Sequence, residues 1–521
     1  MLFFIRYKQT FLLVPIRQHA LSHTISASKP AHAHVLNISS NCVHKTVNLR
    51  FFTPSNTEEI SVKMFKTLAF YIALVAICAG VGFKYYLEAV PDVPDLDYQK
   101  WWGDGQKPEK DDESIRPFKV TFNDSMIDDL KQRLMKRRPF RQPLEGAQSL
   151  YGMNTFYLEK IIKYWLEEYN FKERADRLNR FPHFKTRIQG LDIHYMHVKP
   201  EAKDKKVLPL LMLHGWPSSS KEFDMVIPTL TKPADGYDFV FEVIAADLPG
   251  FGFSQGTNKR GLSPLQMAII MRNLMKRLGY KQYYIQAGDW GSQTATHMCT
   301  LFPNDILGFH TNMPVSSRPI SDVKFFLGSF FPSLVMEQKY ISRIYPLKKF
   351  FDYIMRESGY FHLQATKPDS VGVALTDSPA GLAAYTLEKI GVCSNRDQLD
   401  TPHGGLENIP LDDLLDTVTI IWVNDCIVTS MRIYMEAFAS DDVFIVHNIP
   451  TPVPTAVVNF KHEVVYQPDW ILRDKYPNLV RSTTLEFGGH FAALHTPKEF
   501  AEEVYASFKD ILQFYNTNNT K

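Results

Sequence analysis

The most regular pattern in the chain is a series of short apolar runs, each followed by a turn that contains glycine. Such runs lie at residues 207–213, 241–246 and 283–287. Runs of this length and composition predict buried strands. Between the second and third runs, Ser263 and Pro264 signal the start of a helix whose apolar residues recur at helical spacing. Alternating strands and helices predict a mostly parallel sheet covered by helices on both faces.

The pattern changes between about residues 315 and 447. Strand alternation stops there, and aromatic-rich stretches with helical character follow, such as DVKFFLGSFFPSLVM and LDDLLDTVTIIWV. Strand-like runs return at 455–460 and 482–487, and a terminal helix follows them. We therefore predict an α/β core in two parts, 201–314 and 448–521, with a helical cap inserted at 315–447.

A different kind of apolar run lies near the N-terminus. Residues 67–83 (TLAFYIALVAICAGVGF) carry no charge and are bracketed by Lys66 and Lys84. This arrangement predicts a transmembrane anchor, which we assign to residues 64–84. The run is shorter than the roughly 20 residues of an ideal span, so a cleaved signal sequence and a buried core helix are the alternatives. The flanking charges do not decide the orientation.

The segments on either side of the anchor differ in composition. Residues 1–63 are basic, with no acidic residue among the first 57, which resembles a transit peptide. We prefer the alternative that translation starts at Met64 and that residues 1–63 form an extension with little structure. Residues 85–114 are rich in Pro and Asp, which predicts a linker that buries little apolar surface. An amphipathic, aromatic segment at 115–200 predicts the first folded part.

Composition narrows the possible functions. The 521-residue chain is 45% hydrophobic and 22% charged with a net charge of +2, which is the profile of a globular protein with a large core. No basic cluster is interleaved with aromatic residues, so we expect no nucleic-acid partner. The five cysteines are widely scattered, which fits neither a disulfide framework nor a C-x-x-C metal site. We therefore expect no metal and no cofactor. Nothing in the sequence specifies an oligomeric state.

Asp289 is the first candidate for chemistry. It follows the strand at 283–287 and lies between Gly288 and Gly291, where a strand turns sharply into a helix. Small neighbours permit the strained turn of a nucleophile elbow, which exposes one side chain at the edge of the sheet. A carboxyl group with a pKa of about 3.9 is ionised at neutral pH, so it attacks without help from a base. The alternative is that Asp289 only caps the helix.

Two later residues complete the chain order of a triad in this fold, which is nucleophile, acid, histidine. His490 follows a predicted strand, and the two glycines before it form a tight loop from which its imidazole can reach Asp289. Glu463 follows the strand at 455–460, where its carboxylate can orient one imidazole nitrogen. Asp469 competes for this role, and either carboxylate can instead be a surface charge.

Backbone N–H groups near Asp289 are candidates for an oxyanion hole. The sequence HGWP follows the first buried strand, and this position predicts that the N–H of Trp216 is one donor. The N–H of Trp290, next to Asp289, would be the second. The alternative is that both tryptophans serve only in core packing. The glycine-rich turn DLPGFGFS, after the second strand, is predicted to support the backbone of the site.

Together, the motifs HGWP, DLPGFGFS, AGDWGS and GGHFAA resemble the microsomal epoxide hydrolase family, including its insect members that process juvenile hormone. The resemblance covers residue 115 to the C-terminus, and the N-terminal apolar anchor matches as well. It implies an α/β-hydrolase fold with a helical cap, with Asp289 as nucleophile, Glu463 as charge partner and His490 as base. Tyr360 in SGYFHLQ and Tyr434 in TSMRIYMEAF stand where the family carries two catalytic tyrosines. Without that match, either tyrosine would be assigned to packing.

The resemblance also implies an activity. Asp289 would attack a lipophilic epoxide while Tyr360 and Tyr434 act as acids on the ring oxygen, and His490 would then activate water to release a vicinal diol. The substrate would be a juvenile-hormone-like or a xenobiotic epoxide, so hormone catabolism and detoxification are both open. We expect a single-pass protein in the endoplasmic reticulum membrane, in contact with lipid through its anchor, with the catalytic domain in the cytosol.

Three other functions are weighed against this one. A haloalkane dehalogenase shares an Asp-Trp pair at the elbow, but it needs halide-binding donors where this chain has tyrosines. A membrane-anchored, non-catalytic binder of lipophilic hormones should have lost Asp289, His490 or a cap tyrosine, and none is lost. A serine esterase needs a serine at the elbow, and this chain has Asp289 there.

Overall fold

A computed structural model describes residues 54–202 and 204–519. Of the extension predicted at residues 1–63, residues 1–53 lie outside these ranges and residues 54–63 are helical. The chain divides into two compact units, and the boundary between them along the chain lies between Ala89 and Val90. The described part of the first unit is one helix, α2 (Pro54–Glu88), which begins before the predicted start of the anchor.

Helix α2 is the candidate membrane anchor. Its segment Ser61–Glu88 is long and apolar enough to cross a membrane, and no residue of its most apolar 18-residue stretch is buried within the protein. In the described part of the chain, a second candidate arises only if α15 (Leu411–Val423) and α16 (Ile427–Ala439) are joined across a bend of 87°. Both of these helices have many buried residues in the second unit, which is typical of core helices.

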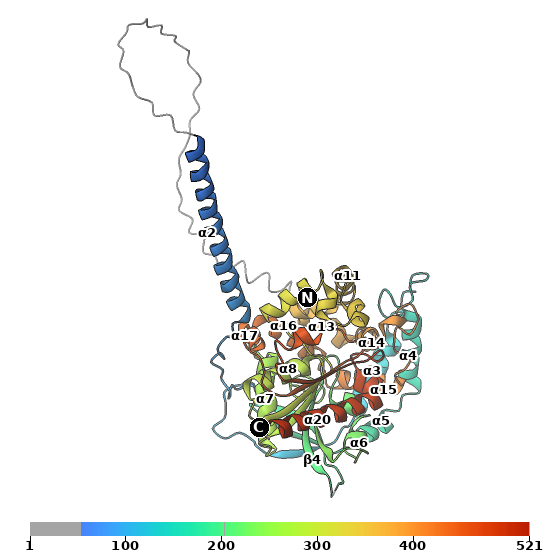
Figure 1. Cartoon of the computed structure of the whole chain (residues 1–521). Coiled ribbons are helices and arrows are strands. Elements are labelled where there is room, and N and C mark those ends of the chain that lie inside the picture. The colour runs from blue at the N-terminus through green and yellow to red at the C-terminus, as the bar shows by residue number, and fades with distance from the viewer. Residues whose placement is uncertain (1–53, 203, 520–521) are drawn as a thin grey trace, which may run out of the picture. The chain divides into compact units, whose positions relative to one another are not determined.

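The second unit is built on a central sheet with helices packed around it (Figure 1), and the order of its nine strands is β1-β2-β3-β5-β4-β6-β7-β8-β9. The pairings from β1 to β5 are antiparallel, and the remaining five are parallel. The strands are β1 (Ile115–Phe118), β2 (His183–Ile188), β3 (Leu191–Val198), β4 (Lys206–Leu213), β5 (Phe239–Ala246), β6 (Tyr283–Ala287), β7 (Ile306–Thr311), β8 (Thr455–Asn459) and β9 (Leu479–Thr484).

The last strand differs from its prediction. β9 ends at Thr484, whereas the apolar run placed the strand at 482–487. The difference arises because β8 ends at Asn459, which pairs with Thr484, so the ladder has no partner for later residues. The residues after Thr484 form instead the loop that leads to His490.

Helices cover both faces of the sheet. Alternate residues of β4 belong to different hydrophobic clusters: Leu211 and Leu213 lie in one, and Leu210 and Met212 lie in the other. Two buried faces explain why the central strands are apolar throughout. The helices around the sheet are α3 (Asp124–Lys136), α4 (Thr155–Glu167), α5 (Phe171–Leu178), α6 (Ile227–Leu230), α7 (Pro264–Arg277), α8 (Asp289–Leu301), α18 (Asp469–Leu472), α19 (Ala492–His495) and α20 (Pro497–Asn519).

The chain between β7 and β8 forms a helical cap, and this fully described stretch contains no strand. One predicted helical stretch, DVKFFLGSFFPSLVM, is broken in the structure. Its first helix ends before Gly328, a poor helix former, and a second begins at Pro332, which lacks the N–H that a continuing helix needs. The cap helices are α9 (Pro319–Leu327), α10 (Pro332–Val335), α11 (Leu347–Glu357), α12 (Gly359–Thr366), α13 (Pro368–Asp377), α14 (Pro379–Ser394), α15, α16 and α17 (Asp441–Asn448).

Candidate active site

Asp289 lies at the sharp turn between β6 and α8. Its φ angle is +47°, in the left-handed region that non-glycine residues rarely adopt. The neighbouring loop passes so close that a Cβ atom on Gly215 would lie 2.0 Å from Oδ1 of Asp289. A Cβ atom on Gly291 would lie 2.4 Å from the carbonyl oxygen of Leu213. Glycine at these two positions therefore lets the elbow form against the end of β4.

The carboxylate of Asp289 has a different partner at each oxygen. The backbone N–H of Trp216 donates to Oδ1 over 2.8 Å. Nε2 of His490 lies 3.4 Å from Oδ2. Trp290 belongs to the first turn of α8, where backbone N–H groups have no acceptor within the helix. The structure therefore brings the predicted Trp216 donor to the carboxylate, while the N–H of Trp290 is in the first turn of α8, next in the chain to Asp289.

His490 is oriented by Glu463. The Nδ1 atom of His490 donates to Oε1 of Glu463 over 2.5 Å, and the N–H of Val464 donates to the same oxygen over 2.7 Å. Burial alone would lower the pKa of His490, but the negative charges of Glu463 and Asp289 raise it well above its ordinary value. Asp469, the competing acid, accepts a hydrogen bond from Ser482 instead. The structure thus places Glu463, and not Asp469, on the imidazole.

The two cap tyrosines lie together above the elbow. Tyr360 comes from α12 and Tyr434 from α16, and their ring centroids are 6.1 Å apart. The ring of Trp216 stacks on Tyr360 at 5.6 Å, and the ring of Trp290 packs edge-on against Tyr434 at 4.7 Å. Burial raises the pKa of both phenols well above 10, and the charge of Asp289 adds to the effect. Both groups are therefore protonated at neutral pH and able to donate.

The glycine-rich turn supports the loop that carries Trp216. The fully buried carboxylate of Asp247 accepts hydrogen bonds from the Ser220 and Phe253 backbone N–H groups, and its Oδ2 lies 2.8 Å from Nδ1 of His194. Burial would raise the pKa of Asp247, but His194 and these donors hold it below its usual range. The hydroxyl of Thr429 on α16 donates to the carbonyl of Gly250 over 2.7 Å. The turn therefore joins the Trp216 loop to the cap helix that carries Tyr434.

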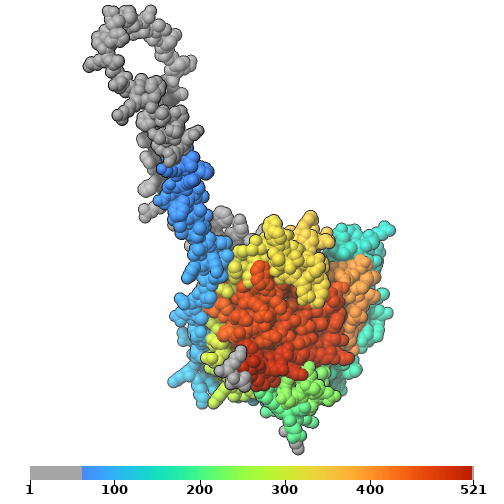
Figure 2. Space-filling view, viewed as in Figure 1, coloured from blue at the N-terminus to red at the C-terminus, as the bar shows by residue number. Residues whose placement is uncertain are grey.

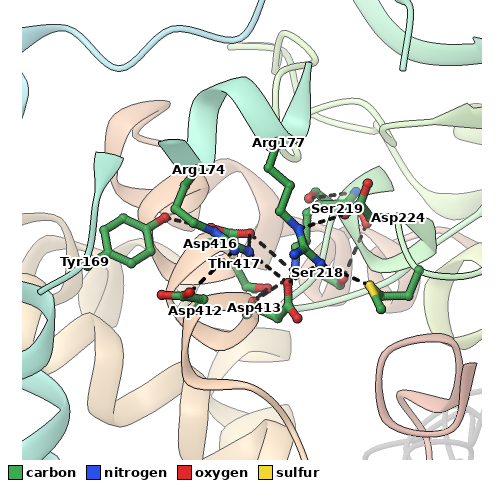
Figure 3. Close-up of polar contacts among 12 residues, drawn as sticks. Tyr169, Arg174, Arg177, Ser218, Ser219, Asp224, Asp412, Asp413, Asp416 and Thr417 are labelled. Atoms are coloured by element: carbon green, nitrogen blue, oxygen red, sulfur yellow. Dashed lines mark hydrogen bonds and ion pairs between the residues drawn. The ribbon is translucent and has the colours of Figure 1, made fainter. Parts of the chain in front are cut away.

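A buried cluster of ion pairs holds the cap to the rest of the second unit (Figure 3). Arg174 of α5 pairs with Asp416 of α15 at 2.6 Å and with Asp413 at 2.9 Å. Lys221, in the loop that also carries Trp216, pairs with Asp413 at 3.1 Å. The hydroxyl of Tyr169 donates to Asp416 over 2.7 Å. Since buried charges need partners, this cluster fixes the N-terminal segment, the Trp216 loop and the cap relative to one another.

Glu222 is a site residue that the sequence interpretation missed. Burial raises the pKa of its carboxyl group to about 7, and the charges of Asp289 and Glu463 raise it while that of His490 lowers it. Glu222 lies in the short 3-10 helix Ser220–Phe223, which packs against α19, the helix that follows His490. Its sequence signal is weak, because an acidic residue a few positions after HGWP is indistinguishable from a surface charge.

The comparisons with known proteins agree on one family. Residues 115–223 match the family model described as epoxide hydrolase N terminus, and residues 209–338 match that of the alpha/beta hydrolase fold. The chain is 65% identical over 454 residues to the juvenile hormone epoxide hydrolase of Manduca sexta, covering 87% of this chain and 98% of that protein. It is 42% identical over 413 residues to epoxide hydrolase 1 of Sus scrofa, covering 78% of this chain and 91% of that protein.

A solved structure extends the comparison to three dimensions. The crystal structure of juvenile hormone epoxide hydrolase from the silkworm Bombyx mori matches with a TM-score of 0.78 and 45% identity, covering 81% of this chain and 100% of that chain. The fold and the family match define this protein as an α/β hydrolase. An aspartate, Asp289, lies where β6 turns into α8. At these identities and coverages, the chain belongs to the microsomal epoxide hydrolase family and is an epoxide hydrolase. The predicted family and fold class are confirmed.

Proposed function

We propose that this protein converts lipophilic epoxides and water to vicinal diols through a covalent ester of Asp289. The observation that carries the proposal is the set of contacts on one carboxylate. Oδ1 of Asp289 accepts from the N–H of Trp216, Oδ2 faces His490, and Tyr360 and Tyr434 lie close enough for the charge of Asp289 to raise their pKa. A nucleophile, a base and two acids are thus gathered around one point.

In the first step, Oδ2 of Asp289 attacks an epoxide carbon. A C–O ester bond forms while the ring C–O bond breaks, and the ring oxygen takes a proton from Tyr360 or Tyr434 as it becomes basic. The carboxylate is ionised without assistance, so His490 is not consumed in this step. The step requires no redox change.

In the second step, His490 removes a proton from water, and the resulting hydroxide attacks the carbonyl carbon of the ester. Negative charge develops on Oδ1, where the N–H of Trp216 already donates and that of Trp290 lies nearby. The ester C–O bond then breaks, the released alkoxide takes the proton of the hydroxyl group just added to the carbonyl carbon, and the diol leaves with the carboxylate of Asp289 restored. The proton that His490 took from water then passes to the phenolate of the tyrosine, so that both groups return to their starting protonation states.

We further propose juvenile-hormone-like epoxides as the substrate class. The support is the 65% identity to a protein named juvenile hormone epoxide hydrolase, which extends over 98% of that relative. Purified full-length protein should hydrolyse a juvenile-hormone-like epoxide with a larger kcat/KM than cis-stilbene oxide. The reverse order would favour a general detoxifying enzyme, and no hydrolysis of either would favour a hormone binder.

We also propose that α2 anchors the protein once in the endoplasmic reticulum membrane, with the catalytic unit in the cytosol. The support is the length and apolar character of α2, together with the similarity to epoxide hydrolase 1. Protease protection of microsomes tests the orientation. The catalytic unit should be digested without detergent, and protection would place it in the lumen.

Removing the cap phenols should slow ester formation. Tyr434→Phe and Tyr360→Phe should each lower the rate about 10-fold to 100-fold, because one phenol remains, and the double variant should lose about 10³-fold or more. Rapid-quench measurement of the ester in a single turnover isolates this step. Tyr385→Phe is the matched control, because its ring also packs against Trp216 but is not assigned a proton. If Tyr360→Phe and Tyr434→Phe formed the ester as fast as Tyr385→Phe, the two phenols would not be the acids of this step.

Glu222→Gln should shift the pH dependence of ester hydrolysis. With its pKa raised to about 7, Glu222 becomes charged across neutral pH and then stabilises the imidazolium of His490. Water activation needs neutral His490. Gln stays neutral, so His490 should lose its proton more easily, and the rising limb of the rate should move to lower pH by roughly 0.5–1 unit.

The test of this shift is the single-turnover rate of ester hydrolysis measured between pH 5 and pH 9, a range of about 4 units around the His pKa. Glu486→Gln is the control, because Glu486 is exposed and pairs with Arg343 away from His490. Superimposable profiles for Glu222→Gln and the unchanged protein would show that Glu222 does not influence the base.

A further inference from the structure

The end of α9, the loop after it and the start of α10 expose a group of large apolar side chains. The exposed fractions are 51% for Leu327, 75% for Phe330, 62% for Phe331 and 78% for Leu334. Single exposed apolar residues are common on soluble proteins, but four within eight residues are typical of an interaction surface. We call residues 327–334 the cap patch. Figure 2 shows this part of the chain in yellow, on the outer surface of the second unit.

The cap patch is held outward by the packing beneath it. Val335 is buried directly after the patch, and the hydroxyl of Tyr345 donates to the carbonyl of Phe325 over 2.7 Å. The ring of Phe325 also packs edge-on against Phe350 of α11, with centroids 5.7 Å apart. Because its base is fixed on both sides, the loop presents its apolar side chains to the surroundings as part of a folded element.

The chain segment that contains the cap patch carries a small excess of positive charge. Residues 319–367 contain seven Lys and Arg but only four Asp and Glu, a net charge of +3, whereas the whole chain carries +2. The side chain of Lys348 on α11 is 83% exposed and pairs with Asp352, one turn away, at 2.7 Å, and Lys349 is its neighbour in the sequence. Apolar and aromatic side chains flanked by basic ones are the combination that binds at the surface of an anionic bilayer.

A bilayer is also within reach of the catalytic unit. Helix α2 is the candidate span, and it ends at Glu88, while the second unit begins at Val90. With α2 in a membrane, the connection to the catalytic unit is short, because Leu96 and Trp102 in the predicted linker at 85–114 are already buried in the core of that unit. A weak surface contact is then strengthened by the anchor, because the effective concentration of lipid is high.

We propose that the cap patch inserts its apolar side chains into the surface of the bilayer that holds α2. The cap would then take up apolar epoxide from the lipid. Phe325 below the patch contacts α11, and α12, which carries Tyr360, follows α11 after Ser358. The docked cap therefore brings the bilayer next to the helices that lead to the site.

Lipid photolabelling tests the docking directly. The full-length protein is reconstituted in vesicles that contain anionic phospholipid and a lipid with a diazirine in its acyl chain. After irradiation, peptides that include residues 327–334 should carry label, as should peptides from α2. Phe330→Asp with Phe331→Asp should reduce the label on the patch about tenfold and leave the label on α2 unchanged, because charge strongly disfavours insertion. Leu150→Asp with Tyr151→Asp is the matched control, since these exposed residues lie outside the cap.

Label on α2 without label on the patch would overturn the proposal, as would crosslinks from the patch to a second protein chain in place of lipid. Kinetics supply an independent readout that rests on the proposed reaction. For cis-stilbene oxide delivered in vesicles, the doubly substituted patch should raise KM about tenfold with kcat unchanged, whereas KM for water-soluble styrene oxide should not change. An inactive protein with a labelled patch would refute the reaction and not the docking.

Discussion

Asp289→Ala should reduce kcat for epoxide hydrolysis by about 10⁴-fold or more. In the proposed cycle, the carboxylate supplies the only bond to the substrate carbon, so no ester forms without it. The remaining groups, which are the two phenols and His490, can bind the epoxide but cannot open it by the same route. The measurement is diol formation by the purified protein at saturating substrate.

The loss must be separated from unfolding. Alanine keeps a Cβ atom at the strained φ of +47°, so the substitution does not relieve the strain of the elbow, and the thermal unfolding temperature of the variant must be measured alongside its activity. Asp469→Asn is the matched control for loss of a carboxylate, because Asp469 bonds to Ser482 and not to the site. A folded Asp289→Ala protein with activity within tenfold of the unchanged protein would exclude Asp289 as the nucleophile.

His490→Gln should separate the two steps of the cycle. Asp289 should still attack the epoxide, so about one equivalent of ester should form rapidly and then persist, with steady turnover reduced about 10³-fold or more. The peptide that contains Asp289 should gain the mass of the epoxide, and mass spectrometry of the digested protein detects it.

His495→Gln is the control for this experiment, because His495 lies on the neighbouring helix α19 and makes no contact with Glu463 or Asp289 that the structure records. It should turn over normally and accumulate no ester. If His490→Gln neither forms the ester nor releases diol, His490 is needed for the first step, and the proposed division of roles is wrong.

The parts of the protein that could be predicted from sequence are those with local signals. Asp289 was recognised because small residues surround it after an apolar strand, and the structure indeed shows the positive φ that such a turn requires. The strand predicted at 283–287 is present with the same bounds, since it is buried on both faces and bounded by glycine. Such features can be predicted from local sequence, because a strained turn needs small residues next to it and a buried strand needs a continuous apolar run.

Other features depend on contacts between distant parts of the chain. The choice between Glu463 and Asp469 required the fold, because only the packing of the loop after β8 against the loop after β9 brings Glu463 to His490. Tyr360 and Tyr434 could not be selected among 24 tyrosines without the family resemblance. The end of β9 was predicted too late in the chain, because β9 stops where its partner β8 stops. The sequence of β9 alone does not show where β8 ends.

The buried ion pairs were missed for a similar reason. Arg174, Lys221 and Asp413 are separated by up to 239 positions along the chain, and each is an ordinary charged residue in its local sequence. Only the folded arrangement shows that they join the N-terminal segment, the Trp216 loop and the cap. Charged residues carry little local information about burial, because their usual location is the surface.

The covalent role of Asp289 is the central claim, and a single turnover in oxygen-18 water tests it most directly. With enzyme in excess over cis-stilbene oxide, water attacks the ester carbonyl, so label should enter the carboxylate of Asp289 while the first diol contains an oxygen from the enzyme. Mass spectrometry of the peptide and of the diol measures both. Label that appears directly in the diol, with none in Asp289 of the folded and active protein, would show that water attacks the epoxide itself and would contradict the proposed mechanism.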